Sequence, residues 1–356
     1  MSGAPPNFEV GPIRPPNEAE SLLVRVSRNC PWNRCAFCPV YKGRRFELRS
    51  ADEVVADIEA MAQVAASDYP EPQIARFLNR GGKTAFLQDA NALITPVADL
   101  ERILRTLREH FPSLERVTTY ARSHTLTKRS VDDLVRLREA GLDRVHVGLE
   151  SGSDRVLDLV DKGATAGRHI EAGHRAKAAG LELSLYVMPG LGGRELSEDH
   201  AVETARVLSV IDPHFIRLRT LIIAPGTEME TLRDEGRFEP MSDVEVAQEL
   251  RVLLGGLEGI ESTFRSDHTL NLLQDIDGKL PGDLPKLLAI VDAFLALSSD
   301  EQELFVVGRR LGMMRSLPHL QESRRRVPAL NALRTLRERY PGPLDEAIRQ
   351  IMQTFV

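Results

Sequence analysis

Six short apolar segments alternate with helical patterns between residues 22 and 223, and this alternation predicts an α/β fold. Repeated β-then-α units imply a parallel sheet with right-handed crossovers. Curled toward closure, such a sheet makes a partial (β/α)6 barrel of the TIM type, whose functional residues lie at the carboxyl ends of the strands. Beyond residue 230 the pattern is largely helical, so we expect a mostly helical C-terminal region.

The strands are placed on apolar runs, and the helices on apolar residues at helical spacing. The expected strands cover residues 22–26, 84–87, 116–120, 144–149, 181–188 and 215–223. Ser50 is expected to cap the first helix, and Glu53 three residues later completes a capping box. Another helix is marked by a stripe of apolar residues, namely Leu100, Ile103, Leu104 and Leu107.

The composition is that of an ordinary globular protein. Of 356 residues, 42% are hydrophobic and 28% are charged, and no apolar run approaches the ~18 residues of a membrane helix. The predicted division is an extended arm at 1–20, rich in Pro and Gly, a barrel at 21–228, and a helical region at 229–356 that covers the substrate. The net charge of -6 gives no general attraction to nucleic acid, and a cytoplasmic location is expected.

All three cysteines lie within nine positions, at Cys30, Cys35 and Cys38. Three thiolates this close indicate an iron-sulfur site, because such clusters take Cys thiolates as ligands. Three ligands leave one iron of a 4Fe-4S cube open to a small molecule. The alternatives are a zinc site that recruits a fourth ligand such as a His, and thiols with a purely structural role.

The C-x4-C-x2-C segment, with Phe37 before its last Cys, resembles the motif of the radical S-adenosylmethionine (radical SAM) enzymes. Their usual C-x3-C-x2-C spacing is one residue shorter. The resemblance implies that Cys30, Cys35 and Cys38 hold one oxygen-sensitive 4Fe-4S cluster and that Phe37 contacts SAM. It also implies that the open iron chelates the amino and carboxylate groups of SAM. An electron, from a donor such as flavodoxin or ferredoxin, then splits SAM into methionine and a 5'-deoxyadenosyl radical.

Two loops after predicted strands carry further candidates for SAM binding. Asp89 lies where the family often has G-G-E-P, the segment that lines the methionine amino group. Ala90 stands in place of the Glu, so either Asp89 or backbone carbonyls are expected to take that role. Arg122 follows the strand at 116–120, and an Arg can bind the SAM carboxylate through two parallel hydrogen bonds. The alternative for Arg122 is a solvated loop residue.

The segment from His146 to Ser153 reads H-V-G-L-E-S-G-S. It resembles the strand-four segment of methylthiotransferases and of relatives of oxygen-independent coproporphyrinogen oxidase. The resemblance implies that Glu150 and Ser151 face the ribose or the methionine part of SAM. The alternative is that residues 151–154 cap the next helix.

Two later strand ends supply the last candidates. Pro189 and Gly190 resemble the family's glycine-rich segment that backs the adenine. Arg217 and Arg219 lie on one face of a strand by period-two alternation. If that face is the interior they are substrate or SAM ligands; otherwise they are surface residues. His268, in a polar cluster at 266–271, is either a substrate contact or structural.

The leading function is a radical SAM enzyme that abstracts hydrogen from a small organic substrate, followed by rearrangement, oxidation, bond cleavage or C-C bond formation. Modification of RNA or a peptide is the alternative, with nucleic acid held unlikely. A non-catalytic iron-sulfur or zinc protein is a more distant one. If all three cysteines ligate the radical cluster, none is left for a second cluster. The resemblance implies that sulfur insertion draws on a second cluster as its sulfur source, so we expect a product without newly inserted sulfur.

Overall fold

The computed structural model describes residues 7–340 and 342–353, which form two compact units. Unit 1 comprises the described residues up to Asn33 together with Val40–Gly148 and Gly167–Ser184. Unit 2 comprises Arg34–Pro39, Leu149–Ala166 and the described residues from Leu185 onward. The predicted boundaries at 20/21 and 228/229 stay a prediction, since compactness does not show which segments fold independently.

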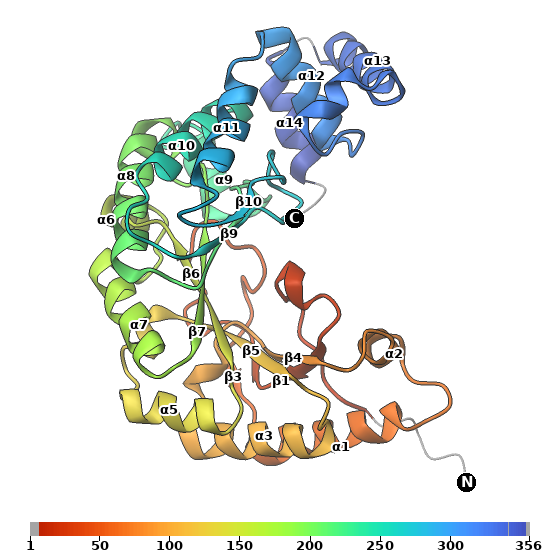
Figure 1. The fold of residues 1–356 in the computed structure, drawn as a ribbon, viewed down its shortest axis with the longest axis vertical. Helices are drawn as coiled ribbons and strands as arrows, with labels where there is room; N and C mark the ends of the chain where they lie inside the picture. The colour runs from red at the N-terminus through yellow and green to blue at the C-terminus, as the bar shows by residue number, and fades with distance from the viewer. Residues whose placement is uncertain (1–6, 341, 354–356) are drawn as a thin grey trace. The chain divides into compact units, whose positions relative to one another are not determined.

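Unit 1 contains a parallel sheet in the order β1-β4-β5-β6 (Figure 1). Its strands are β1 (Leu22–Arg25), β4 (Thr84–Gln88), β5 (Arg116–Ala121) and β6 (Arg144–Glu150), whose last two residues belong to unit 2. Each starts within a residue of its predicted position. A two-stranded antiparallel ladder, β2 (Ser27–Arg28) with β3 (Glu47–Leu48), brackets the cysteine segment in sequence and was not predicted.

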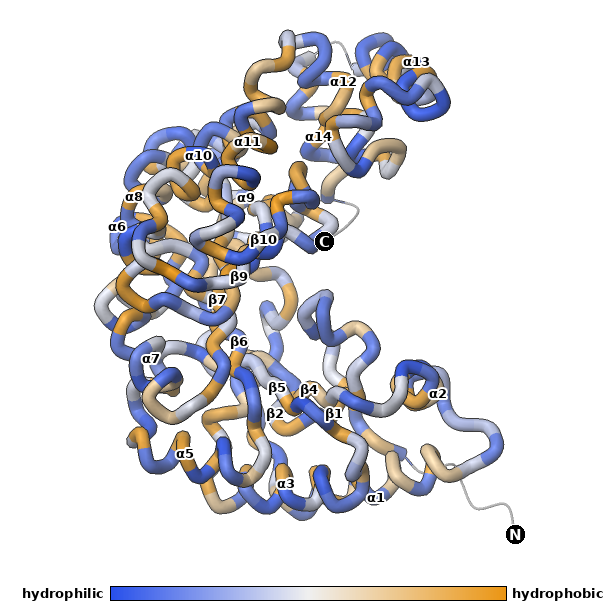
Figure 2. The backbone as a smooth tube through the Cα atoms, viewed as in Figure 1, coloured by the Kyte–Doolittle hydropathy of each residue, from blue (hydrophilic) through white to orange (hydrophobic). Residues whose placement is uncertain are grey.

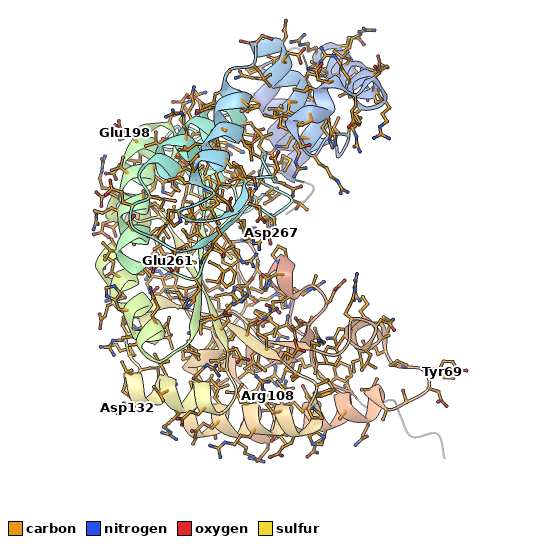
Figure 3. All side chains as sticks on the ribbon, viewed as in Figure 1. Tyr69, Arg108, Asp132, Glu198, Glu261 and Asp267 are labelled. Atoms are coloured by element: carbon orange, nitrogen blue, oxygen red, sulfur yellow. The ribbon has the colours of Figure 1, made fainter. Side chains whose placement is uncertain are left out.

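Amphipathic helices cover this sheet. The helices of unit 1 are α1 (Ala51–Ala65), α2 (Pro72–Asn79), α3 (Val97–His110), α4 (Ser123–Leu126), α5 (Val131–Glu139) and α7 (Ala166–Ala178), with 3-10 turns η1 (Pro16–Glu18) and η2 (Ala92–Ile94). The predicted capping box of Ser50 and Glu53 begins α1. α1, α3 and α5 lie side by side (Figure 1). Arg108 of α3, labelled in Figure 3, donates to Asp143 at 2.6 Å just before β6.

Unit 2 continues with the order β7-β8-β9-β10. These strands are β7 (Glu182–Val187), which begins in unit 1, β8 (Phe215–Leu218), β9 (Thr263–Arg265) and β10 (Asp277–Lys279). β8 ends at residue 218, so the predicted strand at 215–223 was too long. Beyond Leu218 the N–H groups of Arg219 and Leu221 still bond the carbonyls of Val187 and Pro189, at 3.0 and 2.9 Å. The N–H of Thr220 between them bonds the side chain of Asn271 at 2.9 Å in place of a strand.

Helices dominate the rest of unit 2, as predicted for the C-terminal region. They are α6 (Asp154–Leu159), α8 (Gly193–Ile211), α9 (Glu228–Asp234), α10 (Asp243–Gly255), α11 (Leu284–Leu295), α12 (Ser299–Arg310), η3 (Leu317–Gln321), α13 (Ser323–Arg339) and α14 (Leu344–Gln353). Apolar and polar residues alternate along them in Figure 2. Among the described residues, none of the helices is both long and apolar enough to cross a membrane. The α/β fold class, a partial TIM-like barrel with a mostly helical C-terminal region, is confirmed.

The described residues of the N-terminal arm, from residue 7 on, contribute buried side chains to unit 1. Glu18 in η1 is fully buried and accepts hydrogen bonds from Ser21 at 2.5 Å and from Arg116 at 3.4 Å. Its carboxylate also lies 3.7 Å from the Nε2 atom of His146. Hydrogen bonding by His146 and the charge of Arg116 lower the Glu18 pKa even though burial opposes this. Glu18 therefore packs into unit 1 near the start of β5.

Gly152 lies where the chain passes directly against α8. A Cβ atom at this position would lie 2.3 Å from the carbonyl oxygen of Glu203. The Gly152 N–H donates to the Thr204 hydroxyl at 2.8 Å, which holds the segment in that close approach. Glycine is thus required here by space.

Replacing Gly152 by Ala is expected to lower the free energy of unfolding by roughly 1–3 kcal/mol, because helix backbone has to shift to admit the methyl group. Gly255→Ala is the matched control, since a Cβ there meets nothing within 4 Å. Urea denaturation of the metal-free protein measures both variants. Equal midpoints for the two would contradict the close approach.

Candidate functional site

The cysteine segment contributes to both units. Cys30 belongs to unit 1, whereas Cys35 and Cys38 belong to unit 2. All three thiols lie in the described part of the chain, are half-buried, and are not joined in disulfides. The surroundings of Cys30 and of the other two thiols are therefore described separately.

Two asparagines fix the backbone around Cys30. Asn29 and Asn33 adopt left-handed conformations with φ of 69° and 49°, which Asn tolerates better than most residues. The Asn33 N–H points at the Cys30 sulfur, 3.4 Å away. Its side chain donates to the carbonyl of Tyr41 at 2.5 Å, and the Asn29 side chain donates to the carbonyl of Arg45 at 2.6 Å. These bonds connect the two ends of the cysteine segment.

Asp89, directly after β4, anchors the start of the same segment. Its fully buried side chain accepts the Asn29 N–H at 3.0 Å and two bonds from Arg25, at 2.6 and 2.9 Å. Burial raises the pKa of the Asp89 carboxyl, while the Asn29 N–H and Arg25 act in the opposite direction. These contacts favour a role in positioning Cys30 over the predicted contact with the methionine part of SAM.

The N-terminal arm completes this network through Glu9. Its carboxylate pairs with Arg25 at 2.5 Å, Arg28 at 2.8 Å and Arg49 at 3.7 Å. The hydrogen bonds from Arg28 are the largest cause of the lowered Glu9 pKa. Glu9 therefore shares Arg25 with Asp89, and the arm is part of the support of the cysteine segment.

Arg122, directly after β5, lies beside Trp32 of the cysteine segment. Its guanidinium group is 5.0 Å from the ring centre of Trp32, a cation–π contact within unit 1. Burial lowers the pKa of the neighbouring His124, and the charges of Arg168, Arg122 and Lys128 lower it further. Arg122 therefore belongs to a cationic surface of unit 1.

In unit 2, Ala36 holds the second half of the cysteine segment in place. Its N–H donates to the carbonyl of Val160 at 2.9 Å, and its carbonyl accepts the N–H of Met229 at 3.1 Å. Cys35 and Cys38 pack against the same apolar cluster, whose buried members are Ala36, Phe37, Val156, Val160, Met188, Leu191, Leu196, Ile223, Met229 and Phe238. The two thiols therefore border an apolar core.

Glu150, the last residue of β6, pairs with a lysine that lies over Phe37. The Lys162 ammonium group is 2.9 Å from the Glu150 carboxylate and 5.7 Å from the ring centre of Phe37. Glu150 has φ of 64°, a left-handed conformation that costs of order 1–3 kcal/mol outside glycine. Its carbonyl accepts the N–H of Met188 at 3.0 Å, which helps to hold that conformation.

Ser151 faces His200 instead of solvent. The Ser151 hydroxyl is 2.8 Å from Nδ1 of His200, and both residues are fully buried. The helix-capping alternative for this segment is confirmed for Ser153, which accepts the N–H of Val156 at 3.3 Å at the start of α6.

The buried Glu249 of α10 accepts the N–H of Gly190 at 2.7 Å, beside Pro189.

Arg217 and Arg219 have different surroundings. Arg217 is 5% exposed in its side chain and pairs with Asp267 at 2.6 Å. Arg219 is half-buried, and within residues 7–340 and 342–353 its guanidinium group has neither a hydrogen bond nor an ion pair. The alternative that both are surface residues is wrong for Arg217.

Sequence reasoning missed several residues of these surroundings, among them Trp32, Lys162, Glu249 and Asp267. The Trp between the first two cysteines was a visible signal for its contact with Arg122. Lys162 lies 12 residues after its partner Glu150. Glu249 and Asp267 contact residues 59 and 50 positions away, and no local pattern marks such contacts.

The donors fit an iron-sulfur cluster. An N–H directed at Cys30 favours a thiolate, and the apolar border of Cys35 and Cys38 limits water around a bound cluster. Among the described residues, three or more His, Cys, Asp or Glu side chains do not converge as they would around a single metal ion. A four-iron cluster differs from a single ion, because each thiolate binds its own iron.

Comparisons with known proteins place these features in a family. The chain is similar to the tRNA-2-methylthio-N(6)-dimethylallyladenosine synthase of Paracidovorax citrulli, at 25% identity over 62% of this chain and 47% of that protein. It is also similar to the biotin synthase of Desulfatibacillum aliphaticivorans, at 27% identity over 42% of this chain and 45% of that protein. The chain thus spans less than half the length of these relatives.

Among solved structures, the archaeal Elp3 of Methanocaldococcus infernus, with an N-terminal deletion, matches with a TM-score of 0.47 at 15% identity. The match covers 76% of this chain and 62% of that one. A family model described as the Radical SAM superfamily matches residues 24–207, more than half of the chain. The protein therefore belongs to the radical SAM superfamily and is an enzyme that uses a 4Fe-4S cluster and SAM.

Proposed function

We propose that Cys30, Cys35 and Cys38 ligate the single 4Fe-4S cluster of this enzyme. The observation that carries the proposal is the cysteine segment itself, held by Asn29 and Asn33 in unit 1 and by Ala36 in unit 2. The chemistry supplied there, with cluster and SAM bound, is reductive cleavage of SAM to methionine and a 5'-deoxyadenosyl radical that abstracts hydrogen from the substrate. The residues of the chain position the thiolates and exclude water.

The same proposal assigns the contacts of SAM. In unit 1, Arg122 supplies a cation for the carboxylate, held in orientation by the Trp32 ring. In unit 2, the Glu150 carboxylate is fixed by Lys162 and can accept from ribose hydroxyls or the ammonium group. Other contacts are assigned to Phe37, Ser151, Pro189 and Gly190, with Ser151 acting through its backbone because its hydroxyl bonds His200.

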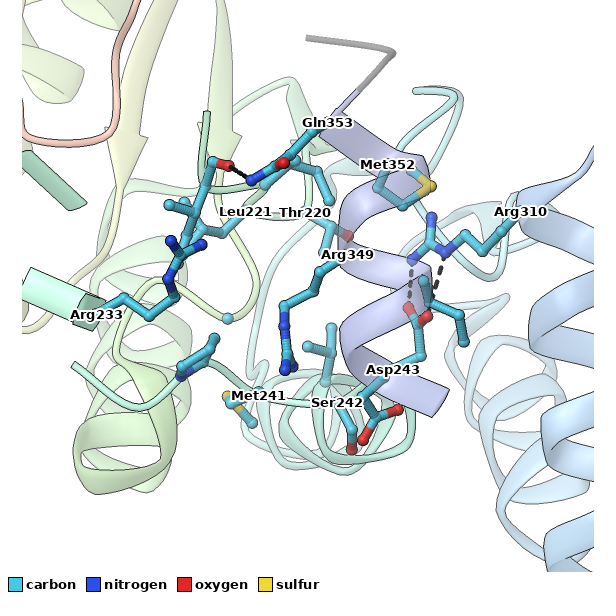
Figure 4. A pocket seen from close by; sticks show the side chains of 17 residues that line it. Thr220, Leu221, Arg233, Met241, Ser242, Asp243, Arg310, Arg349, Met352 and Gln353 are labelled. Carbon is cyan, nitrogen blue, oxygen red and sulfur yellow. Dashed lines mark hydrogen bonds and ion pairs between the residues drawn. The ribbon is translucent and has the colours of Figure 1, made fainter. Parts of the chain in front are cut away.

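The substrate we propose is a small organic molecule, covered by the C-terminal helices. A cavity of about 60 Å³ in unit 2 lies between the chain after β8 and α14 (Figure 4). Arg349 of α14 and Arg233 of α9 point into it, and Gln353 donates to the carbonyl of Ile223 at 3.1 Å. These contacts support α14 as part of a lid, which would keep water from a radical reaction.

A tRNA substrate is the second candidate, because the chain is similar to a named tRNA-modifying synthase. The cationic surface around His124, formed by Arg122, Lys128 and Arg168, suits phosphate groups. If the substrate is a tRNA, added tRNA should accelerate the formation of 5'-deoxyadenosine; if it is a small molecule, added tRNA should leave the rate unchanged.

We further propose a cytoplasmic location and an electron donor such as flavodoxin or ferredoxin, since oxygen and disulfide-forming conditions would destroy the cluster.

Single replacement of Cys30, Cys35 or Cys38 by Ala is expected to abolish SAM cleavage, because each change removes a cluster ligand. Anaerobically reconstituted wild type should bind about four iron per chain. Iron content and 5'-deoxyadenosine are measured with a strong reductant present. Full cleavage by any one variant would refute the assignment, as would a second cluster or a thiolated product.

Glu150→Gln and Arg122→Ala are each expected to weaken SAM binding by ~1.5 to 3 kcal/mol, because each loses a hydrogen bond to a charged group. Equilibrium dialysis of the reconstituted protein measures the affinity, and iron content reports whether the cluster persists. Arg136→Gln, which breaks an exposed pair with Glu101, is the control. Wild-type affinity in both test variants would show that SAM binds elsewhere.

Asp89→Asn is expected to lower the free energy of unfolding by roughly 3 kcal/mol, since a buried pair with Arg25 is broken. The exposed pair of Asp52 with Arg102 provides the control Asp52→Asn, expected to cost less than about 1 kcal/mol. Asp89→Asn should also retain less iron and show a changed electron paramagnetic resonance signal. A wild-type electron paramagnetic resonance signal with full iron content in this variant would show that Asp89 contributes to stability and does not position Cys30.

A further inference from the structure

Arg219, directly after β8, differs from the neighbouring arginines in its surroundings. The guanidinium group of Arg219 makes neither a hydrogen bond nor an ion pair with any residue that the structure describes, although the side chain is half-buried. Its neighbours on the same strand face differ. Arg217 pairs with Asp267, which is labelled in Figure 3, and the adjacent Arg265 pairs with Asp277. Arg219 is therefore a cation whose charge the described chain leaves available to a ligand that supplies an acid.

His268, in the loop after β9, presents a hydrogen-bond donor near this cation. Its Nδ1 accepts the N–H of Leu270 at 3.2 Å, so the proton of the neutral ring is on Nε2. Burial lowers the pKa of His268 to about 4, and the charge of Arg219 lowers it further while Asp267 raises it. At neutral pH the His268 ring is therefore uncharged and can donate a hydrogen bond through Nε2. It lies close enough to Arg219 for the charge of that residue to lower its pKa.

The loop that carries His268 is fixed to the end of β8. Asn271 accepts the N–H of Thr220 at 2.9 Å and donates to the carbonyl of Leu218 at 2.9 Å. Gln274 donates to the carbonyl of His268, also at 2.9 Å. The backbone that carries both residues is thus held in place before any ligand binds, which reduces the ordering cost of binding.

Two buried arginines of α12 fix the same loop from its other side. Arg309 donates to the carbonyl of Asn271 at 3.0 Å, and Arg310 donates to that of Leu270 at 2.6 Å. Arg310 also pairs with Asp243, so its charge is balanced within the protein. The loop is therefore fixed by Arg309 and Arg310, and the side chains of Arg219 and His268 are not needed to hold it.

We propose that Arg219 and the Nε2–H of His268 bind an oxyanion group of the substrate, a carboxylate or a phosphate. Both groups only donate hydrogen bonds, so they favour an acceptor over an amine or a cation. Arg219 offers the planar fork that matches two oxygens of a carboxylate or phosphate. The nearby acid, Asp267, is already paired with Arg217. Arg219 is assigned here to the substrate, one of the two ligands expected of it from the sequence.

That the anion belongs to the substrate rests on the proposed function, whereas anion binding itself does not. The probes are inorganic phosphate and succinate, with chloride at equal ionic strength as reference, added to the anaerobically reconstituted protein. The readout is the nuclear magnetic resonance signal of His268, labelled on its ring and assigned with the His268→Gln variant. A saturable shift with phosphate or with succinate is expected, and the more effective probe identifies the oxyanion.

Arg219→Gln is expected to weaken this binding about tenfold or more, because a charged hydrogen-bond donor is lost. Arg219→Lys keeps the charge but loses the fork, so an intermediate affinity is expected. Arg251→Gln, which breaks an exposed pair with Asp292, is the matched control and should bind as wild type. Thermal denaturation verifies that all three variants fold.

No saturable shift with either probe would overturn the proposal, as would equal affinity in wild type and Arg219→Gln. These outcomes leave the cluster assignment intact if the wild type still forms 5'-deoxyadenosine. Conversely, loss of anion binding in Arg219→Gln with SAM cleavage preserved supports a substrate site separate from the SAM contacts.

Discussion

The buried carboxylate of Asp89 is the contact on which the order around Cys30 depends. A carboxylate removed from water is costly unless charges and N–H groups compensate it, and here Arg25 and the Asn29 N–H do so. Arg25 is shared with Glu9 of the N-terminal arm. Consequently β1, the end of β4, the arm and the start of the cysteine segment form one electrostatic network.

Unit 2 applies the same principle with other residues. The buried Glu249 accepts the N–H of Gly190 and the hydroxyl of Ser197, and the buried His200 meets Ser151. Backbone at the ends of β6 and β7 is thus held by side chains of α8 and α10, the helices that pack behind it. Arg219 contrasts with these satisfied groups, because its partner is absent from the described chain. An unsatisfied donor beside satisfied ones is a physical reason to look for a ligand.

Strands with continuous apolar runs were predictable, and those without were not. β4 and β6 are buried over nearly their whole length, so their sequences show runs that stand out. β9 and β10 have three residues each and carry polar residues such as Arg265 and Asp277, so no pattern marks them. β8 was predicted too long because the apolar run continues to Ile223, whereas the ladder ends where Asn271 takes the N–H of Thr220.

The sequence by itself indicated the three cysteines as candidate ligands and determined the alternation of strands and helices and the family, because thiol spacing and periodicity are local properties of the chain. Only the tertiary structure decided that Asp89 holds the N–H of Asn29, next to Cys30, and that Glu249 holds the N–H of Gly190. The members of these two pairs are 60 and 59 residues apart in sequence. It likewise showed that Arg219 has no acid partner among the described residues. Periodicity shows which face of an element is buried, but the choice of a distant hydrogen-bond partner depends on how the elements pack.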